Sequence, residues 1–300
     1  MQKERVLITG ASGFMGSNLV KYLLEKDYAV VGLSRKKNAV SSHPDMHWIS
    51  QFDDLKTDKI DYVINLAGES IGKGRWTASR KEQLIASRTK MTEQLYEYLA
   101  KRSIVPKCII SGSAIGYYGI DEQEQWQSVC TEQSPSQLIF QSELCQRWEQ
   151  AALKHTQQNT KIIRLGIVLS AKGGILPQML LPVRSRLFGK IGHGRQPIVW
   201  VHLQDVLRAI EFIMTKTPIE QVFNLTAPEK VTQAEFIKTA EQQLGLKTWF
   251  SLPAGLMKLM MGEQSQLVLN GQYVHSKALS DAGFTFKYNT LKEALKDLLS

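Results

Sequence analysis

The most informative motif of this 300-residue chain is the stretch Arg5-Val-Leu-Ile-Thr-Gly10-Ala-Ser-Gly13-Phe-Met-Gly16. A short apolar run leads into a glycine-rich turn, and the turn opens a segment with the apolar spacing of a helix. Gly10 permits a tight turn out of a strand, Gly13 lets the backbone approach a pyrophosphate, and Gly16 allows close packing of helix on strand. The helix N-terminus then offers free amide groups and a partial positive charge to phosphates. The stretch therefore predicts the strand, phosphate turn and helix that begin a dinucleotide-binding fold.

Strand and helix patterns alternate through the first half of the chain. Apolar runs that predict strands lie at Arg5–Thr9, Ala29–Leu33, Asp61–Leu66, Pro106–Ser111, Lys161–Leu165 and, after a break, Gln221–Leu225. Helical spacing recurs at Phe14–Lys26, about Thr77–Lys101, about Gln137–His155, Thr232–Leu244 and Leu291–Leu299. Strands that alternate with helices imply parallel pairing, right-handed crossovers and a sheet covered on both faces. The predicted fold is α/β, with a Rossmann-type doubly wound parallel sheet.

The alternation ends after Ser170, where glycines punctuate a loop-rich stretch. We expect residues 1–170 to form the dinucleotide-binding core, with the strand near 221–225 returning to it. Residues 171–300 are expected to form mainly a smaller substrate-side lobe and C-terminal cap.

The composition narrows the class of protein. With 43% hydrophobic and 22% charged residues it is that of an ordinary globular protein, and no stretch approaches eighteen consecutive apolar residues, so we expect no membrane span. The three cysteines, Cys108, Cys130 and Cys145, have no C-x-x-C spacing and no histidine cluster nearby. This argues against a disulfide framework or a metal site and fits a reducing compartment. Since the chain runs almost at once into its first predicted strand, we expect no signal peptide and a cytoplasmic protein.

The net charge of +9 raises the question of nucleic acid as a partner. The cations are dispersed, however, and no DNA-binding motif accompanies them. We expect no nucleic-acid partner and a basic surface that serves an anionic cofactor and a small-molecule substrate.

The residues after the second predicted strand, Leu33-Ser34-Arg35-Lys-Lys, select the cofactor. NAD sites usually place an acidic residue there, about twenty residues beyond the glycine turn, to bind the ribose 2′-hydroxyl. An acidic residue would repel a 2′-phosphate, whereas Arg35 can stack on adenine and bind that phosphate with its forked guanidinium. Ser34 can donate a further hydrogen bond. Although a solvated basic loop is the alternative, the pattern favours NADP.

Further motifs follow the other predicted strands and the long helix. They are Asn65-Leu-Ala-Gly68-Glu-Ser-Ile, Arg75-Trp76-Thr77, Ser87-Arg88-x-x-x-Thr92, Ser111-Gly-Ser-Ala-Ile-Gly-Tyr-Tyr-Gly119, Arg164-Leu-Gly-Ile-Val-Leu, Trp200-Val-His202-x-x-Asp205, Phe223-Asn224-Leu-Thr-Ala-Pro228 and Gly283-Phe-Thr-Phe. Together with the glycine turn, whose first two glycines are one residue further apart than in GxGxxG, they resemble the extended short-chain dehydrogenase/reductase superfamily. Within its NAD-dependent epimerase/dehydratase family, the chain resembles the subgroup called 39U. The resemblance covers essentially the whole chain.

The resemblance implies a dinucleotide across the carboxyl ends of the strands. With the turn and the basic loop, it completes a predicted cofactor site of Gly10, Ser12, Gly13, Phe14, Met15, Gly16, Ser34, Arg35, Leu66, Ala67, Gly68, Arg88 and Val168. By this match Leu66 and Ala67 line the adenosine side, and Val168 lies beside the nicotinamide. Arg88 reaches back to the cofactor phosphates, unless it is a charge on the helix surface.

The catalytic pattern of such relatives is Ser or Thr with Tyr-x-x-x-Lys, in which the tyrosine transfers a proton and the lysine lowers the tyrosine pKa. Ser113 matches the serine. Gln141 and Cys145 take the places of the tyrosine and lysine in one register, and a register one residue earlier gives Phe140 and Leu144. Neither register restores the pair.

A substitute proton donor is therefore needed for this chemistry. Tyr117 or Tyr118, close to Ser113, is one choice, unless both rings merely pack under a loop. Glu69, Lys81 or His202 is another choice on the substrate side, although His202 lies in an apolar run and is also interpretable as a structural histidine.

The loop after the Asp61–Leu66 strand offers a cation and an aromatic face in Arg75 and Trp76, a pairing suited to a sugar or carboxylate. With Glu69 and His202 they form the predicted substrate site. Arg184, Arg186 and Lys190 are placed to hold a diphosphate, or are solvated charges.

Two functions remain open. One is an NADP-dependent oxidoreductase or epimerase-like enzyme acting on a small polar or sugar-derived substrate; the other is a non-catalytic NADP-binding sensor or regulatory protein. The apolar stripes of the two long helices would serve a homodimer interface or the core of the chain.

Overall fold

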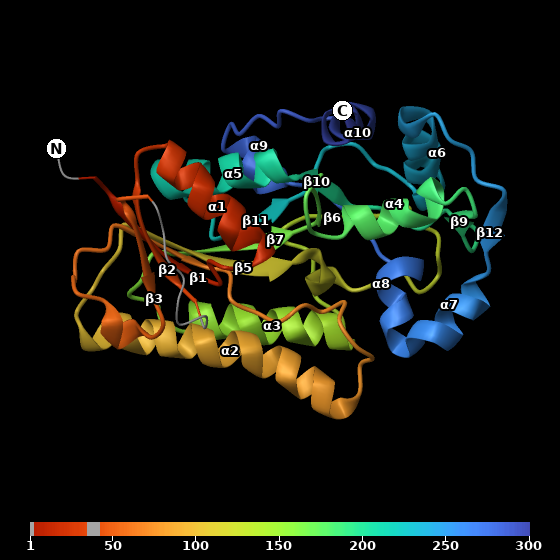
Figure 1. The fold of residues 1–300 in the computed structure, drawn as a ribbon. Coiled ribbons are helices and arrows are strands. Elements are labelled where there is room, and N and C mark those ends of the chain that lie inside the picture. Colours follow the sequence, from red (N-terminus) through yellow and green to blue (C-terminus); the bar gives the residue numbers. More distant parts are fainter. Residues whose placement is uncertain (1–2, 35–42) are drawn as a thin grey trace.

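A seven-stranded parallel sheet forms the centre of the computed structural model, which describes residues 3–34 and 43–300 (Figure 1). Its strands are β1 (Arg5–Thr9), β2 (Ala29–Leu33), β3 (Met46–Ile49), β4 (Tyr62–Asn65), β5 (Cys108–Ala114), β7 (Thr160–Leu165) and β11 (Val222–Leu225). Their order in the sheet is β11-β7-β5-β4-β1-β2-β3, and every pairing is parallel. The strand order reverses between β1 and β4, which confirms the doubly wound Rossmann-type sheet and defines its ligand crevice.

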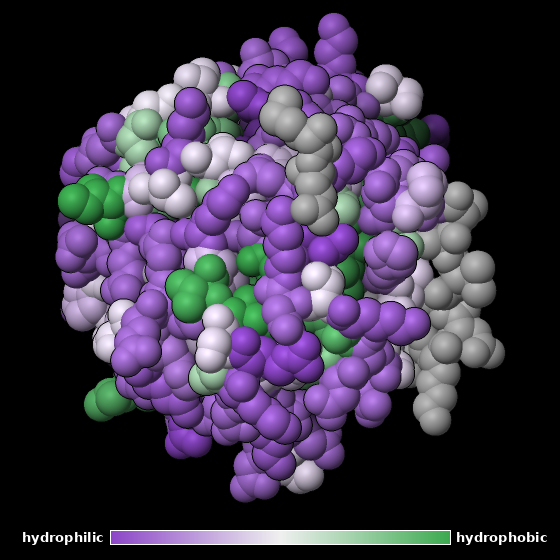
Figure 2. All heavy atoms as spheres, turned by 90° about the vertical axis from the view of Figure 1, so that its left-hand side faces the viewer, coloured by the Kyte–Doolittle hydropathy of each residue, from purple (hydrophilic) through white to green (hydrophobic). Residues whose placement is uncertain are grey.

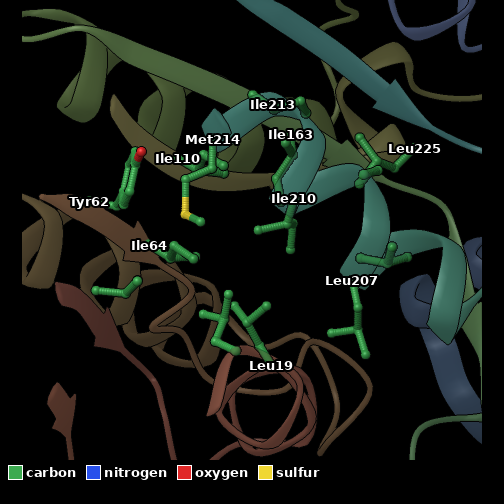
Figure 3. Packing of buried hydrophobic residues seen from close by; sticks show 14 of the residues in the cluster. Leu19, Tyr62, Ile64, Ile110, Ile163, Leu207, Ile210, Ile213, Met214 and Leu225 are labelled. Atoms are coloured by element: carbon green, nitrogen blue, oxygen red, sulfur yellow. The ribbon is translucent and has the colours of Figure 1, made fainter. Parts of the chain in front are cut away.

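Helices cover both faces of this sheet. Helices α1 (Phe14–Glu25) and α5 (Leu203–Lys216) lie on one face, and α2 (Ala78–Lys101) and α3 (Phe140–Leu153) lie on the other (Figure 1). Figure 3 shows Leu19 of α1 and Leu207, Ile210 and Ile213 of α5 directed at the apolar side chains of the strands. Burial of these apolar side chains on both faces, each worth about 1.5–3 kcal/mol, is the main force that holds the layers together.

Most of the other elements form a C-terminal lobe beside the carboxyl ends of the strands (Figure 1). Three short parallel pairs join β8 (Ile167–Leu169) with β10 (Trp200–His202), β9 (Phe188–Ile191) with β12 (Phe250–Leu252), and β6 (Val129–Cys130) with β13 (Tyr273–Val274). Its helices are α4 (Leu176–Arg184), α6 (Gln233–Leu244), α7 (Ala254–Met261), α8 (Gln266–Leu269) and α10 (Leu291–Leu299). The short helix α9 (Lys277–Asp281) instead packs against strand β11 of the sheet. This lobe has its own core, in which α4, α6 and α10 pack together around Trp200 and Phe236.

More of the second half returns to the sheet than the expected strand near 221–225. Helix α5 packs on the sheet along its length, and Leu279, Phe284 and Phe286 join the same core cluster. Helix α5 and strand β3 are not among the elements that the sequence predicts, because the apolar run that contains His202 precedes α5 directly and β3 is short.

The apolar stripes of α2 and α3 are used within the chain. The two helices pack on each other and on the sheet, through residues such as Leu84, Leu95 and Leu144. Among the described residues, no exposed large hydrophobic side chain belongs to α2 or α3. The homodimer stays a prediction, and these stripes do not lend it support.

The edge formed by the amino ends of the strands is mainly hydrophilic, with a limited hydrophobic area near its centre (Figure 2). Within residues 3–34 and 43–300, no helix combines the length and apolar character needed to cross a membrane.

Candidate functional site

The glycine turn lies where β1 meets α1, at the crevice between β1 and β4. Gly10 has φ +69°, and a Cβ added there would lie 2.8 Å from the carbonyl oxygen of Leu66. A Cβ on Gly16 would lie 2.2 Å from the carbonyl oxygen of Gly10, so both positions exclude a side chain. Gly13 is exposed and is the N-cap of α1, and it offers no side chain to the amide groups of the first helical turn. These amides therefore face the crevice as donors for an anion.

A buried polar network lies beneath the crevice and holds the ends of its strands together. The Thr9 hydroxyl donates to Oδ1 of Asn65 at 2.6 Å, and the Asn65 amide donates to the hydroxyls of Thr92 and Ser111 at 2.8 and 3.1 Å. All four side chains are fully buried. The network ties β1, β4, β5 and α2 together. In the sequence these residues stand out only as motif positions, although a buried Asn at the end of a strand is a signal for such a bridge.

Four of the predicted cofactor residues have partly buried apolar side chains. Phe14, Met15, Leu66 and Val168 are half-buried and pack against the same core cluster of the sheet and its helices. Gly173 and Gly174, in the loop before α4, have positive φ, and a Cβ on them would lie 3.1 and 2.9 Å from the Phe14 ring. This glycine loop therefore packs directly against the first residue of α1.

The predicted NADP-selecting residues lie at the end of β2. Ser34 is buried, and its hydroxyl donates to that of Ser12 at 3.1 Å, which joins the β2 loop to the glycine turn. Arg35 lies outside the described residues.

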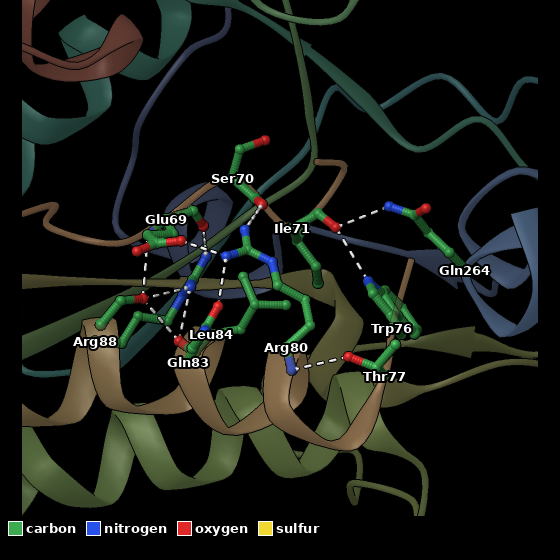
Figure 4. A network of polar contacts seen from close by, with 11 residues as sticks. Glu69, Ser70, Ile71, Trp76, Thr77, Arg80, Gln83, Leu84, Arg88 and Gln264 are labelled. Atoms are coloured by element: carbon green, nitrogen blue, oxygen red, sulfur yellow. Dashed lines mark hydrogen bonds and ion pairs between the residues drawn. The ribbon is translucent and has the colours of Figure 1, made fainter. Parts of the chain in front are cut away.

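Arg88 holds the loop that follows β4 (Figure 4). Its guanidinium donates to the carbonyl oxygens of Glu69 at 2.8 Å and Leu84 at 3.0 Å, and lies 5.1 Å from the centre of the Trp148 ring. A Cβ on Gly68 would lie 3.1 Å from this arginine side chain. Here Arg88 positions the loop rather than reaching the glycine turn. Its close contact with position 68 explains why a residue without a side chain stands there.

The predicted substrate residues of this loop are engaged in contacts of their own (Figure 4). The Glu69 carboxylate pairs with Arg80. Trp76 is buried edge-on against Phe140, with ring centres 4.9 Å apart, and its indole donates to the carbonyl oxygen of Ile71. The buried ring does not offer the aromatic face to substrate that the sequence predicted.

The same loop is attached to the C-terminal lobe. Arg75 donates to the carbonyl oxygens of Leu259 and Met260 in α7, at 3.2 and 3.0 Å. Lys81, at the start of α2, forms an ion pair with Glu263 at 2.6 Å, so the positive charge of its ammonium group is balanced by a carboxylate. The loop and the lobe thus form one wall of the site.

Ser113 lies at the carboxyl end of β5, as predicted, but its hydroxyl is committed to a buried network. It donates to Glu149 of α3 at 2.6 Å, and Glu149 accepts two hydrogen bonds from Arg164 of β7, each of 2.8 Å. Arg164 also donates to the Tyr118 hydroxyl at 2.8 Å, and Tyr118 donates to Asn224 at 2.7 Å. Burial opposes the charge on Arg164, yet the paired carboxylate outweighs it and raises the pKa of the guanidinium.

The tyrosine and lysine positions of the usual catalytic pair hold Gln141 and Cys145. In this first register both side chains are buried on α3 and lie beside Gly116 in the turn Ile115–Tyr118, whereas Phe140 and Leu144 of the second register pack against Trp76. Burial raises the pKa of the Cys145 thiol to about 11, and such a group is neutral where a lysine would be charged.

The two tyrosines after β5 differ. Burial raises the pKa of Tyr118 to about 12, and its hydroxyl is fully used in the network. Tyr117 is half-buried, with the Arg164 guanidinium 3.4 Å from its ring centre. Its hydroxyl makes no hydrogen bond within the described part of the chain, so it remains available to a ligand.

His202 is held inside the C-terminal lobe. It caps α5 by accepting from the amide of Gln204 at 3.1 Å, stacks on Tyr288 with ring centres 3.8 Å apart, and places Nε2 3.3 Å from Asp297. Its burial and contacts match the structural alternative for this residue and do not support contact with substrate.

Comparison with known proteins agrees with this geometry. The model of the NAD dependent epimerase/dehydratase family matches residues 6–226, and a domain of unknown function, DUF1731, matches residues 252–298. Epimerase family proteins of Staphylococcus epidermidis and Staphylococcus saprophyticus are 35% and 36% identical over 303 residues, with 99% of each chain covered. Among solved structures, human epimerase family protein SDR39U1 (isoform 2) with NADPH superimposes with a TM-score of 0.87, at 29% identity and over 98% of each chain. This chain belongs to the NAD dependent epimerase/dehydratase family.

Proposed function

We propose that this protein binds NADP(H) in the crevice between β1 and β4. The uncapped amides of the α1 N-terminus, with Gly13 exposed above them, are suited to a pyrophosphate. Phe14, Leu66 and Val168 offer apolar contacts. The choice of NADP over NAD rests on Arg35 in the sequence, and a human relative of similar fold was solved with NADPH.

We further propose that the protein is an NADP-dependent oxidoreductase with Tyr117 as its proton donor. The carrying observation is that Tyr117 has an uncommitted hydroxyl at the carboxyl end of β5, whereas Ser113 and Tyr118 are committed to the buried network. A bound nicotinamide supplies or accepts a hydride. In the reducing direction Tyr117 donates its proton to the substrate oxygen, and the Arg164 guanidinium holds the Tyr117 ring in place. The solvent then restores the proton. The substrate class we propose is small and polar, or sugar-derived.

The test is NADPH consumption with a panel of aldehydes, ketones and keto sugars. For any substrate that is reduced, Tyr117→Phe should lower kcat by about 100-fold or more, the usual contribution of a general acid, with NADPH affinity unchanged. Ser113→Ala, the matched control, should retain most of kcat because its hydroxyl serves the network. An unchanged kcat in Tyr117→Phe together with a large loss in Ser113→Ala would contradict this assignment.

A second function, an NADP-binding sensor without turnover, is favoured by one observation. The usual tyrosine and lysine positions carry Gln141 and Cys145, both buried. NADPH binding without consumption across the whole panel would support the sensor and exclude the oxidoreductase for these substrates.

A further inference from the structure

A surface on the C-terminal lobe combines exposed apolar side chains with cations, and the function proposed above leaves it without a role. We call it the apolar–basic surface. Twelve large hydrophobic side chains are exposed among the described residues, and eight of them lie in or beside α4, β12 and α7. These eight are Ile175, Leu181, Leu187, Trp249, Phe250, Leu256, Leu259 and Met260. Such a concentration of exposed apolar groups marks an interaction site rather than ordinary surface.

Backbone contacts join the elements of this surface. Strand β12 pairs with β9, the amide of Phe250 donates to the carbonyl oxygen of Leu187 at 3.0 Å, and the amide of Trp249 donates to that of Arg186 at 3.3 Å. The amide of Leu187 donates in turn to the carbonyl oxygen of Pro182 in α4, at 3.3 Å. Helix α7 follows β12 almost directly, and Figure 1 shows these elements together at the end of the molecule opposite the N-terminus.

Helix α7 presents an apolar face to solvent. Leu256, Leu259 and Met260 recur at positions i, i+3 and i+4, on one side of the helix. They are 43%, 75% and 59% exposed, whereas Met257 is buried against the lobe. The face is unpartnered within the described part of the chain.

The exposed charged side chains of this surface are positive. The sequence contains no Asp or Glu from residue 150 to residue 204, and none from residue 242 to residue 262. These two stretches supply α4, β9, β12 and α7, with exposed cations at Arg184, Arg186, Lys247 and Lys258. Carboxylates that flank the second stretch are already used, since Glu241 accepts from Thr248 at 2.7 Å and 2.6 Å, and Glu263 pairs with Lys81.

We propose that the apolar–basic surface docks this protein on an anionic lipid bilayer. A bilayer surface offers negative headgroups to the cations and an apolar interior to the leucines, and exposed tryptophan is favoured at such interfaces. A second copy of the chain fits less well, because a two-fold interface through this patch would set cations against cations. The docking is peripheral, by side chains that lie in the headgroup region.

The docked surface adjoins the candidate site. Arg75, in the loop after β4, donates to the carbonyl oxygens of Leu259 and Met260 on α7. A bilayer that holds α7 therefore lies next to one wall of the crevice, so the protein is placed to reach a substrate at the membrane surface.

Vesicle sedimentation with the full chain tests the proposal. The protein should bind vesicles that contain phosphatidylglycerol and should not bind vesicles of phosphatidylcholine alone, and high salt should release it. The double variant Phe250→Glu, Leu259→Glu and the charge-reversed variant Lys247→Glu, Lys258→Glu should each lower the partition coefficient by about tenfold or more. Ile219→Glu, at another exposed position in the loop before β11, is the matched control and should bind as the unaltered chain does. Circular dichroism establishes that each variant is folded.

Absence of binding to both kinds of vesicle by the unaltered chain would overturn the proposal. Equal loss in the control variant would do the same, since the contact would then not lie at this surface. If light scattering shows instead a dimer that the Phe250→Glu, Leu259→Glu variant dissociates, without vesicle binding, the surface is an interface between copies and the lipid proposal is wrong.

Discussion

At the scale of single residues, the buried Glu149–Arg164 pair organises the carboxyl end of β5. It binds the hydroxyls of Ser113 and Tyr118, and the Arg164 guanidinium lies on the ring of Tyr117. An unpaired charge in such a place is costly, whereas a hydroxyl that merely donates to an already paired carboxylate contributes little.

Glu149→Ala should therefore lower the free energy of unfolding by about 3–5 kcal/mol, because it leaves Arg164 buried without its counter-ion. Ser113→Ala should lower it by only about 0.5–1.5 kcal/mol, since the two arginine hydrogen bonds to Glu149 remain. Urea denaturation of both variants measures the difference. Similar small losses in both variants would show that the pair is not the support described here.

The same residues show the limit of sequence reasoning. Ser113 was identified from the motif pattern and lies at the carboxyl end of β5, whereas the pattern left open whether Gln141 and Cys145 or Phe140 and Leu144 of α3 stand at the usual catalytic positions. That the Ser113 hydroxyl points to Glu149 was not predictable, because this contact depends on how α3 packs against β5 and β7. Long-range packing, rather than residue type, decides which hydroxyl remains available.

At the scale of elements, the periodicity of apolar residues predicted those helices and strands that depend mainly on their own sequence. The glycine turn, α1 and most strands of the sheet lie where the periodicity indicated. Strand β3 has only four residues, too few for a clear alternation. Helix α5 was missed although Val206, Leu207 and Ile210 carry helical spacing, since the apolar run before it obscured the cap at His202.

The cap of α5 gives a pH-dependent prediction. Burial lowers the pKa of His202 below its usual value, despite the nearby Asp297 carboxylate. Above about pH 6.5 the histidine is neutral in both states, whereas at lower pH the unfolded chain takes up a proton that the folded chain resists. Stability is therefore lost as the pH falls from about 6.5 through the folded pKa.

Thermal unfolding of a His202→Asn variant checks this. Asparagine also caps a helix but does not titrate, so the variant should lose less stability than the unaltered chain between about pH 7 and about pH 5. Parallel losses in the two proteins would indicate that His202 does not carry this dependence.

At the scale of the whole molecule, the two halves of the chain are joined more closely than the sequence suggested. Helix α5, β11 and the segment around Phe284 return to the sheet. Arg75 binds α7 itself, and Lys81 and Ile71 bind the residues that follow it. The expected boundary near residue 170 thus marks a change of local pattern, and the crevice lies between parts of one connected structure. Composition and periodicity report neither these contacts nor the direction of the loop that carries Trp76.

NADP(H) binding in the crevice between β1 and β4 is the main property that we propose for this protein, and calorimetric titration with NADPH and NADH measures it. We predict tighter binding of NADPH than of NADH. Gly13→Asp should weaken NADPH binding by about 100-fold or more, because a carboxylate would face the pyrophosphate. Gly255→Asp is the matched control, since a Cβ there meets nothing within 4 Å, and it should bind NADPH normally. Equal or absent binding of the two nucleotides by the unaltered chain, or full NADPH affinity in Gly13→Asp, would contradict the claim.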